Sequence, residues 1–87
     1  MLFLIASAPD TPEYKTAVQM AGDAGADICL LQNAVYAARS SDSAAMYVLD
    51  DDMKLRGIHE HEISGRPIDY DRLVDLMTTA DKVVGLF

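Results

Sequence analysis

The chain has 87 residues, of which 51% are hydrophobic, enough for one small globular domain over residues 1–87. Its 14 acidic and 7 basic residues give a net charge of −7, so its surface should repel a phosphate backbone, and we expect no direct binding of nucleic acid. A single cysteine excludes an internal disulfide and a CxxC motif. No stretch reaches the ~18 apolar residues of a membrane span, and the composition predicts a soluble, cytoplasmic protein.

The first predicted elements are a buried strand and a capped helix. Leu2–Ala6 is an unbroken apolar run, which is typical of a strand covered on both faces. Thr11 is placed to cap a helix that has Pro12 at its first position. Gly22 and Gly25 should close this helix. Between these limits, apolar residues recur at helical spacing: Tyr14, Ala17, Val18 and Ala21.

The stretch Asp27–Ala38 organises the rest of the prediction. Ile28–Leu31 is a second unbroken apolar run and predicts the central strand. At Gln32 the sequence changes to amides, and an alanine-rich segment over residues 33–39 predicts a short helix. The polar cluster Ser40–Ser43 indicates a loop. Because open parallel sheets meet ligands and partners at the carboxyl ends of their strands, we expect this edge to carry the function.

The next predicted elements are a strand at Ala45–Leu49 and a short helix that begins with three aspartates, Asp50–Asp52. Three carboxylates in a row can resemble a metal site. Acidic first turns are nevertheless common, because carboxylates stabilise the positive end of a helix dipole. We therefore expect one aspartate to cap the helix, the others to lie in its first turn, and Gly57 to end it.

The segment Ile58–Arg66 contains two histidines, His59 and His61, that alternate with glutamates. In a strand they would share a face and could bind a metal together with a third ligand from elsewhere. No third ligand stands at a recognisable spacing, and no metal or other cofactor is predicted. We interpret the segment as an exposed polar loop or an edge strand.

Asp69 is placed to cap the last helix, which leads through a turn into a final strand at Val83–Phe87. The apolar residues of this helix form the clearest helical stripe in the chain, and such a stripe normally faces the core: Tyr70, Leu73, Val74 and Met77. Strands and helices alternate throughout. The sequence therefore predicts an α/β fold, a three-layer α/β/α sandwich around a small, mostly parallel sheet of four or five strands.

Three segments, in this order, resemble the DsrH/TusB family of sulfur-relay proteins. They are LLQNAVYAA (Leu30–Ala38), MYVLDDDMKLRG (Met46–Gly57) and IDYDRLVDL (Ile68–Leu76). Members of that family typically show a strand ending LLxDGVxAA, then a VYxLxxDxxARG segment, then a YxxFVxL helix. The resemblance covers most of the chain after Ile28.

The resemblance implies a DsrEFH-like domain with strand order 4-3-2-1-5. It also implies assembly with DsrE/TusD-like and DsrF/TusC-like subunits, or with further copies of the chain as a homo-oligomer. Assemblies of this kind pass persulfide sulfur along cysteines, either to tRNA for wobble-uridine 2-thiolation or within sulfur oxidation.

The chain departs from the family pattern at two places. Some members carry a cysteine on the first helix, where this sequence has about Ala17 at the matching position and no thiol on the helix. Asn33-Ala34 stands where the family usually has Asp-Gly. The first departure removes the expected sulfur-carrying position.

Cys29 is the only thiol left that could carry sulfur. A carrier needs a thiolate, and therefore a lowered pKa and partial exposure. Cys29 lies mid-strand, has no basic neighbour in sequence, and stands ~13 Å along a strand from the predicted helix start at Asn33. Because burial raises the pKa of a thiol, we expect Cys29 to fill the core.

The residues that remain for function lie at two adjacent strand ends. They are Gln32, Asn33 and Tyr36 after the central strand, and Asp50, Asp52 and Arg56 after the third. Ordinary capping and packing would also account for these residue types. Their clustering at adjacent carboxyl ends favours an interface or ligand edge.

The sequence supports one main hypothesis and leaves two others open. The main one is a structural subunit of a sulfur-relay assembly, with no catalytic activity and no sulfur-carrying cysteine of its own. The alternatives are a stand-alone homo-oligomer that binds a small ligand at the strand edge, and a small metal-dependent enzyme using Asp50, Asp52 and the two histidines. The enzyme has little support, because no Gly-rich phosphate loop, nucleophile–base pair or closed ligand set is visible.

Overall fold

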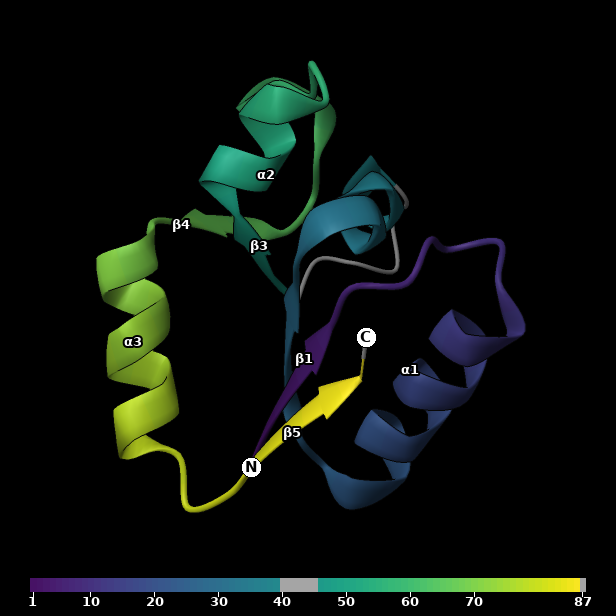
Figure 1. The fold of residues 1–87 in the computed structure, drawn as a ribbon, viewed down its shortest axis with the longest axis vertical. Helices are drawn as coiled ribbons and strands as arrows, with labels where there is room; N and C mark the ends of the chain where they lie inside the picture. The colour runs from purple at the N-terminus through teal and green to yellow at the C-terminus, as the bar shows by residue number, and fades with distance from the viewer. Residues whose placement is uncertain (40–45, 87) are drawn as a thin grey trace.

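Strands and helices alternate along the chain in a computed structural model that describes residues 1–39 and 46–86 (Figure 1). The strands are β1 (Leu2–Ile5), β2 (Asp27–Leu30), β3 (Tyr47–Leu49), β4 (Arg66–Ile68) and β5 (Val83–Leu86). The helical segments are α1 (Pro12–Ala24), α2 (Asp50–Leu55), α3 (Tyr70–Thr79) and the 3-10 helices η1 (Gln32–Arg39) and η3 (Glu60–Glu62). The predicted loop Ser40–Ser43 lies outside the described residues.

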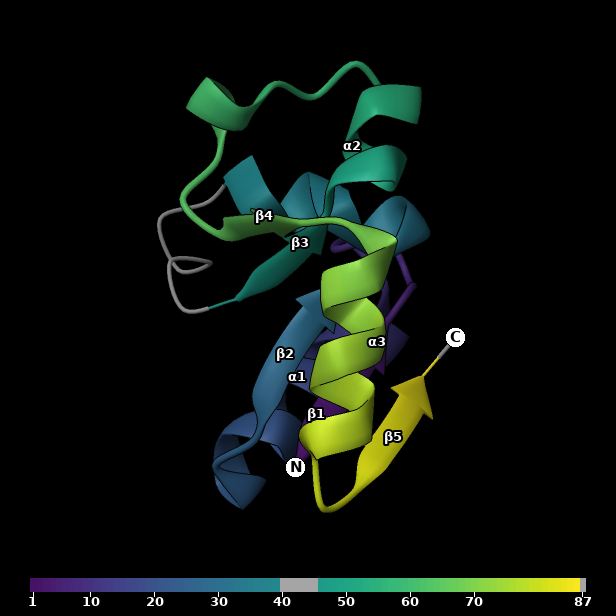
Figure 2. The same cartoon turned by 90° about the vertical axis from the view of Figure 1, so that its left-hand side faces the viewer.

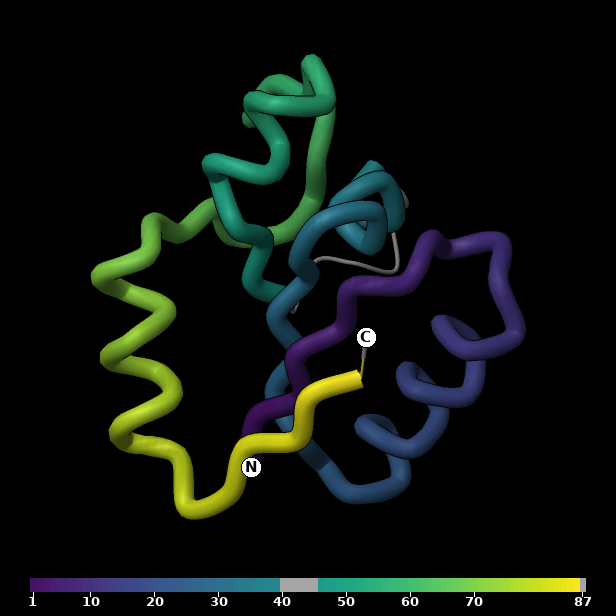
Figure 3. The backbone as a smooth tube through the Cα atoms, in the orientation of Figure 1, coloured from purple at the N-terminus to yellow at the C-terminus, as the bar shows by residue number. Residues whose placement is uncertain are grey.

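The five strands form one sheet in the order β4-β3-β2-β1-β5, and every neighbouring pair is parallel. Figure 3 follows the backbone from β1 through α1 to β2, and later from α3 into β5, which returns beside β1. The α/β prediction is confirmed, and the strand order is the one that the family resemblance implies. The unbroken apolar run around Cys29 forms β2, the central strand, as predicted.

The helices α1 and α3 cover opposite faces of the sheet (Figures 1 and 2). Alternating residues of each strand therefore enter two separate cores. Phe3 and Ile5 of β1 pack on the α1 side, while Leu2 and Leu4 pack on the α3 side. A strand covered on both faces needs apolar residues at every position, which explains the unbroken run of β1. The molecule is the predicted three-layer sandwich.

The predicted ends of α1 are confirmed. The Thr11 hydroxyl oxygen accepts the backbone N–H of Tyr14 at 3.2 Å, and Pro12 follows at the first helical position. Gly25 caps the carboxyl end with φ of 64°, in the left-handed region that glycine adopts without steric cost. Ala17 and Ala21 of the predicted stripe are buried against the sheet.

The prediction that an aspartate caps α2 is wrong. Leu49 occupies the N-cap position, and no side chain caps the helix. The aspartates have other partners: Asp50 pairs with Lys54 at 2.8 Å, and Asp52 accepts the backbone N–H of Gln32 at 2.7 Å. The acidic first turn and the end of the helix are as predicted, with Gly57 at φ of 70° just after it.

Two shorter segments differ from the sequence prediction. The alanine-rich segment after β2 forms the 3-10 helix η1 over its whole length. Within Ile58–Arg66 only Arg66 belongs to a strand, because residues 60–62 form the 3-10 turn η3 and β4 begins at Arg66. The two histidines thus lie in the polar loop of the two alternatives, and strand β4 includes only the last residue of the segment.

The predicted cap of α3 is confirmed, and its predicted core stripe is mostly wrong. Asp69 accepts the backbone N–H of Arg72 at 2.8 Å. Of the four stripe residues only Leu73 is buried, while Tyr70, Val74 and Met77 are 53%, 60% and 41% exposed. The helix instead rests on Leu73 together with Leu76 and Ala80. A helix lays one flank on a sheet, and here a second apolar flank stays uncovered.

Within residues 1–39 and 46–86, no helix has both the length and the apolar character that a membrane crossing requires.

Candidate functional site

Four of the six predicted edge residues meet above the carboxyl ends of β2 and β3. They are Gln32, Asn33, Asp52 and Arg56, which we call the carboxyl-edge cluster. Gln32 and Asn33 begin η1, which follows β2, while Asp52 and Arg56 come from α2, which follows β3. Because parallel strands end at the same edge of a sheet, two segments twenty residues apart in sequence become neighbours there (Figure 1).

Asp52 is the buried centre of the carboxyl-edge cluster, with 8% of its surface exposed. One carboxylate oxygen accepts the Gln32 backbone N–H at 2.7 Å, and the other lies 3.8 Å from Nη1 of Arg56. Gln32 has φ of 47°, a left-handed conformation that costs a non-glycine residue about 1–2 kcal/mol. The hydrogen bond that Gln32 donates to Asp52 holds the chain in that turn.

Arg56 fastens the second side of the cluster. Its Nε–H and Nη2–H groups both donate to Oδ1 of Asn33 at 3.2 Å, and Nη1 donates to the backbone carbonyl of Asp52 at 3.2 Å. The planar guanidinium therefore joins η1 to α2 through a fork that a lysine cannot reproduce. At the turn before Asn33-Ala34, where the chain departs from the family's usual Asp-Gly, the left-handed residue is Gln32.

The side chains of the carboxyl-edge cluster act as a clamp that holds η1 and α2 together. The Asp52 carboxylate accepts from the backbone of η1, while the Arg56 guanidinium donates to the Asn33 side chain and to the Asp52 carbonyl. A general base needs a free lone pair directed at a substrate, and the contacts of Asp52 point into the protein. The carboxyl-edge cluster thus fixes the shape of an edge that another molecule can meet.

Asp50 and Tyr36 do not join the cluster. Asp50 pairs with exposed Lys54 along α2, and this hydrogen bond, followed by the charge of Asp50, raises the pKa of the Lys54 amine. Tyr36 lies on η1 and is 40% exposed. The structure therefore gathers four of the six candidates and leaves these two as separate surface residues.

Cys29 is fully buried in the core on the α3 side of the sheet. Its pKa is raised from 9.0 to about 12, first by burial and second by the negative charge of Asp52. At that value only about one thiol in 10⁵ is ionised near pH 7. The thiol has neither the exposure nor the ionisation that sulfur transfer requires.

The two histidines lie side by side on the η3 turn. The rings of His59 and His61 stack with centroids 5.6 Å apart and planes 7° from parallel. Both side chains belong to exposed residues. Among residues 1–39 and 46–86, no group of three or more His, Cys, Asp or Glu side chains is arranged to hold a metal ion. The pair supplies at most two ligands of a set that needs three or four.

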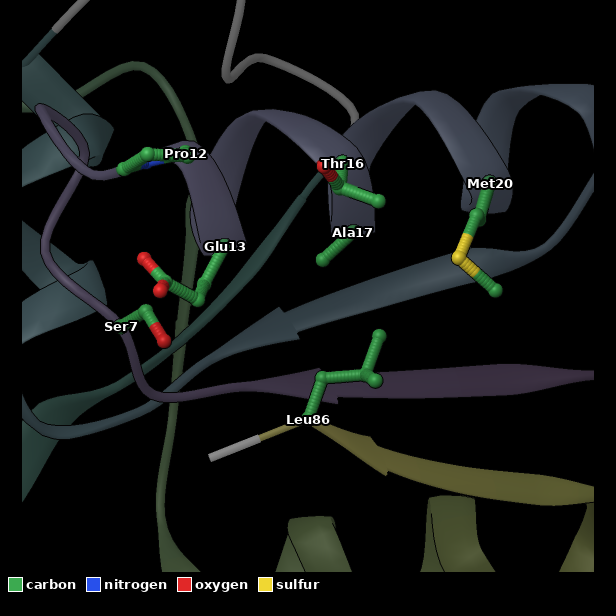
Figure 4. A pocket seen from close by; sticks show the side chains of 7 residues that line it. All are labelled: Ser7, Pro12, Glu13, Thr16, Ala17, Met20 and Leu86. Carbon is green, nitrogen blue, oxygen red and sulfur yellow. The ribbon is translucent and has the colours of Figure 1, made fainter.

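A pocket lies near Ala17, about the position that the resemblance matches to the first-helix cysteine of some family members. Ala17 forms part of the wall of a cavity of about 390 Å³ between α1 and the β5 edge of the sheet. Figure 4 shows Leu86 of β5 pointing toward Ala17, with Met20 further along the helix. Ser7 and Glu13 supply polar groups at one end. No thiol lines this pocket, so its walls contain no sulfur-carrying group.

The sequence prediction missed an exposed apolar flank on α3, formed by Tyr70, Val74 and Met77. A signal for it is present in the sequence. The helix carries two apolar stripes, since Leu76 and Ala80 extend a second one alongside Leu73. Because one helix cannot bury both stripes against a flat sheet, an excess of apolar residues predicts an uncovered surface.

Together the fold and the site define a small α/β domain whose polar edge is held by internal contacts and whose cysteine is enclosed. A protein-family model described as DsrH like protein matches residues 7–83. The chain belongs to the DsrH family, the DsrH/TusB family that its motifs resemble. The comparison with curated proteins gave no match.

Proteins of the DsrH family work in sulfur-relay complexes with other subunits. Membership therefore suggests that this chain is a sulfur-relay subunit. The match spans both strand ends that build the carboxyl-edge cluster, as well as Cys29 and α3.

Proposed function

We propose that the chain is a structural subunit of a sulfur-relay assembly and carries no sulfur on its own cysteine. In this role it acts by contact, shaping or stabilising the subunit that holds the persulfide. The partners are DsrE/TusD-like and DsrF/TusC-like subunits. The pathway is of the tRNA 2-thiouridine or the sulfur-oxidation type, in the cytoplasm.

The observation that supports this proposal is the state of Cys29. Its side chain is inaccessible, and its pKa is raised to about 12 by burial and by Asp52. A sulfur carrier has the opposite environment, with a cation or helix amino terminus beside an exposed thiol. It is the only cysteine in the 87 residues, so covalent transfer by this segment would have to begin with opening of the core.

The surface of the chain supports a role in which it acts by contacting other subunits. The carboxyl-edge cluster presents a fixed edge at the strand ends where α/β domains meet other molecules. The net charge of −7 disfavours direct contact with tRNA. In a tRNA pathway, a partner subunit would therefore hold the nucleic acid.

Persulfide mass spectrometry tests the first part of the proposal. The purified chain is treated with a sulfur donor and Cys29 is examined for an added sulfur. We expect no modification in the folded chain and full modification after unfolding in urea. The variant Leu55→Cys, which places a thiol at a position 81% exposed, is the matched positive control. Stable modification of Cys29 under native conditions would refute the proposal.

Reconstitution tests the second part. The chain is mixed with the DsrE-like and DsrF-like proteins of the same source, and sulfur transfer through the assembly is measured with wild type and with Cys29→Ala. We expect the chain to enter the assembly and the transfer rate to be unchanged by the substitution. A chain that forms only a homo-oligomer, or a rate that collapses with Cys29→Ala, would contradict the assignment.

A further inference from the structure

The two edges of the sheet differ in how well they are protected. At β5, the carbonyls of Lys82 and Leu86 accept the backbone N–H groups of Leu2 at 2.9 Å and Ala6 at 3.1 Å. In a parallel ladder alternate residues face the same neighbour, so Val84 also faces β1, and Val83 and Gly85 direct their N–H and C=O groups outward. Both of these residues are exposed.

At the opposite edge of the sheet, β4 is protected against pairing with a further strand, and we call this edge blunted. Arg66 of β4 donates its N–H to the Met46 carbonyl at 2.9 Å, so Arg66 and Ile68 face β3 and Pro67 takes the outward position. Proline has no N–H to offer, and β4 is only three residues long. Proline on a short edge strand is a common protection against unwanted strand pairing. Among residues 1–39 and 46–86, no proline or covering segment protects the edge of β5 in this way.

The apolar flank of α3 lies above the open edge. Leu76 and Thr79 line a pocket with Asp27 at the start of β2, so this side of the helix is turned toward the centre of the sheet. Tyr70, Val74 and Met77 are exposed on the flank of the helix opposite to that pocket. In Figure 2, α3 lies in front of the sheet, with β2 to one side of it and β5 to the other. Val83 of β5 is 37% exposed on the same face.

The other face of the β5 edge is also apolar and uncovered. The pocket of about 390 Å³ runs between α1 and β5, with Met20 and Leu86 among its walls. Met20 is 47% exposed. A strand added beside β5 would therefore lie between side chains of α1 on one face and of α3 on the other, as β1 does now.

We infer that the open edge of β5, together with the exposed flanks of α1 and α3, is a docking edge for an extended strand of a different subunit. The outward groups of Val83 and Gly85 would pair with the backbone of that strand. Because both faces would be covered, the strand should be apolar on both sides. This inference rests on the proposed function, which supplies the partner.

Charge argues for a different subunit over a second copy. Glu13 lines the pocket beside β5, and Asp71 and Asp75 stand on the exposed side of α3. Lys82 precedes β5, while Asp81 is paired with the amino group of Met1 at 2.8 Å. A second copy would bring the same carboxylates and another net charge of −7. A partner with basic side chains around its strand would meet opposite charges instead.

Amide exchange measured by NMR tests the docking edge directly. The ¹⁵N-labelled chain is compared alone and in complex with the DsrE-like and DsrF-like subunits of the same source. The Val83 and Gly85 amides should exchange rapidly in the free chain and slow by at least about tenfold in the complex. Those of Val84 and Leu86, which face β1, should be protected in both states and serve as internal controls.

Two variants test the same edge by affinity. Gly85→Pro removes an outward N–H that β1 does not use, and Val83→Lys places a charge on the edge. Each should weaken binding by about tenfold or more, while Leu55→Lys, at an exposed apolar residue on α2, should leave it unchanged. Circular dichroism melts confirm that each variant is folded. Val83→Lys keeps the test valid if the proline variant does not fold.

The outcomes separate the two proposals. If the wild-type chain binds no relay subunit, the proposed function fails and the docking edge fails with it. If it binds but the Val83 and Gly85 amides stay unprotected and Val83→Lys binds normally, only the docking edge is overturned. Sedimentation of the chain alone should show no self-association, and a dimer that Val83→Lys dissolves would identify a second copy as the occupant and refute the inference.

Discussion

Cys29 and Asp52 occupy neighbouring regions of the molecule and have opposite surroundings. Cys29 lies in the middle of β2, fully buried among Leu4, Leu49 and Leu73. Asp52 lies at the carboxyl edge, almost as buried, but it receives the Gln32 N–H and lies beside Arg56. Burial alone therefore does not determine what a polar group does. The hydrogen-bond donors around a buried polar group determine whether it holds other residues in place or only fills the core.

The comparison also shows why we propose different roles for the two regions. The sheet interior is closed by helices on both faces, so the Cys29 thiol is buried away from the surface. The carboxyl edge is where the helices begin, and backbone N–H groups without helical partners are available there. Four predictions test this contrast, from the largest expected effect to the smallest.

The substitution Asp52→Ala should lower the free energy of unfolding by about 3 kcal/mol, because it removes a buried carboxylate, leaves the part-buried Gln32 N–H without its acceptor and leaves Arg56 without its counter-ion. Urea unfolding at neutral pH measures this loss. The matched control Asp51→Ala removes an exposed carboxylate of the same turn and should cost less than about 0.5 kcal/mol. Equal losses in the two variants would show that Asp52 is not the centre of the cluster.

Alkaline pH should destabilise the folded chain through Cys29. The folded-state pKa of about 12 lies above the value of 9.0 expected in the unfolded chain. The stabilisation is therefore fully present below pH 9 and is lost as pH rises toward 12. The slope is about 1.4 kcal/mol per pH unit, or about 2 kcal/mol between pH 9 and 10.5.

Cys29→Ala is the control for this prediction, because lysine and tyrosine titrate equally in both proteins. The difference in free energy of unfolding between wild type and the variant should narrow as pH rises. A difference that stays constant up to pH 10.5 would mean that the thiol ionises as readily in the folded chain as in the unfolded one.

Arg56→Lys should lower the free energy of unfolding by about 1–1.5 kcal/mol, since lysine retains the charge but loses the fork to Asn33. Arg39→Lys is the comparison, because Arg39 makes one exposed contact with Glu62 at 3.2 Å and should lose less than about 0.5 kcal/mol. Chemical denaturation of the pair decides between a clamp and an ordinary surface charge at Arg56.

The smallest effect is expected at Gln32. Replacing it with glycine relieves the left-handed conformation and should raise the free energy of unfolding by about 0.5 kcal/mol, after the entropy cost of glycine is subtracted. Gln32→Val should instead cost at least about 1 kcal/mol, because a β-branched residue tolerates this φ poorly. Thermal melts of both variants should shift in opposite directions, and shifts of the same sign would count against strain at this turn.

Much of the fold was predictable because its signals are local. The Thr11 and Asp69 caps, the glycine after α1 and the apolar runs of β1 and β2 each depend on a few adjacent residues. The absence of an aspartate cap on α2, where Leu49 is the N-cap residue, was not predictable in this way. The helix begins one residue earlier than a cap by Asp50 would require, and the Asp52 carboxylate bonds to Gln32, twenty residues away.

The sequence predicted which residues would lie near one another at the candidate site, but it did not predict which of them would be in contact. Parallel strand ends brought Asn33 and Arg56 to one edge, as expected. The sequence could not show that Asp50 would turn along its own helix toward Lys54. Nor could it show which of the two apolar stripes of α3 would be buried, since both have helical spacing.

By itself the sequence determined the element order, the parallel sheet and the burial of Cys29, because hydrophobic runs and local caps encode all three. Only the tertiary structure decided that Asp52 would hold Gln32, that Val74 and Met77 would stay in solvent, and that the sheet would have one blunted and one open edge. Those outcomes depend on which segments become neighbours in space. Several contacts between distant residues could form, and free-energy differences decide which of them does. A local sequence pattern contains no information about those differences.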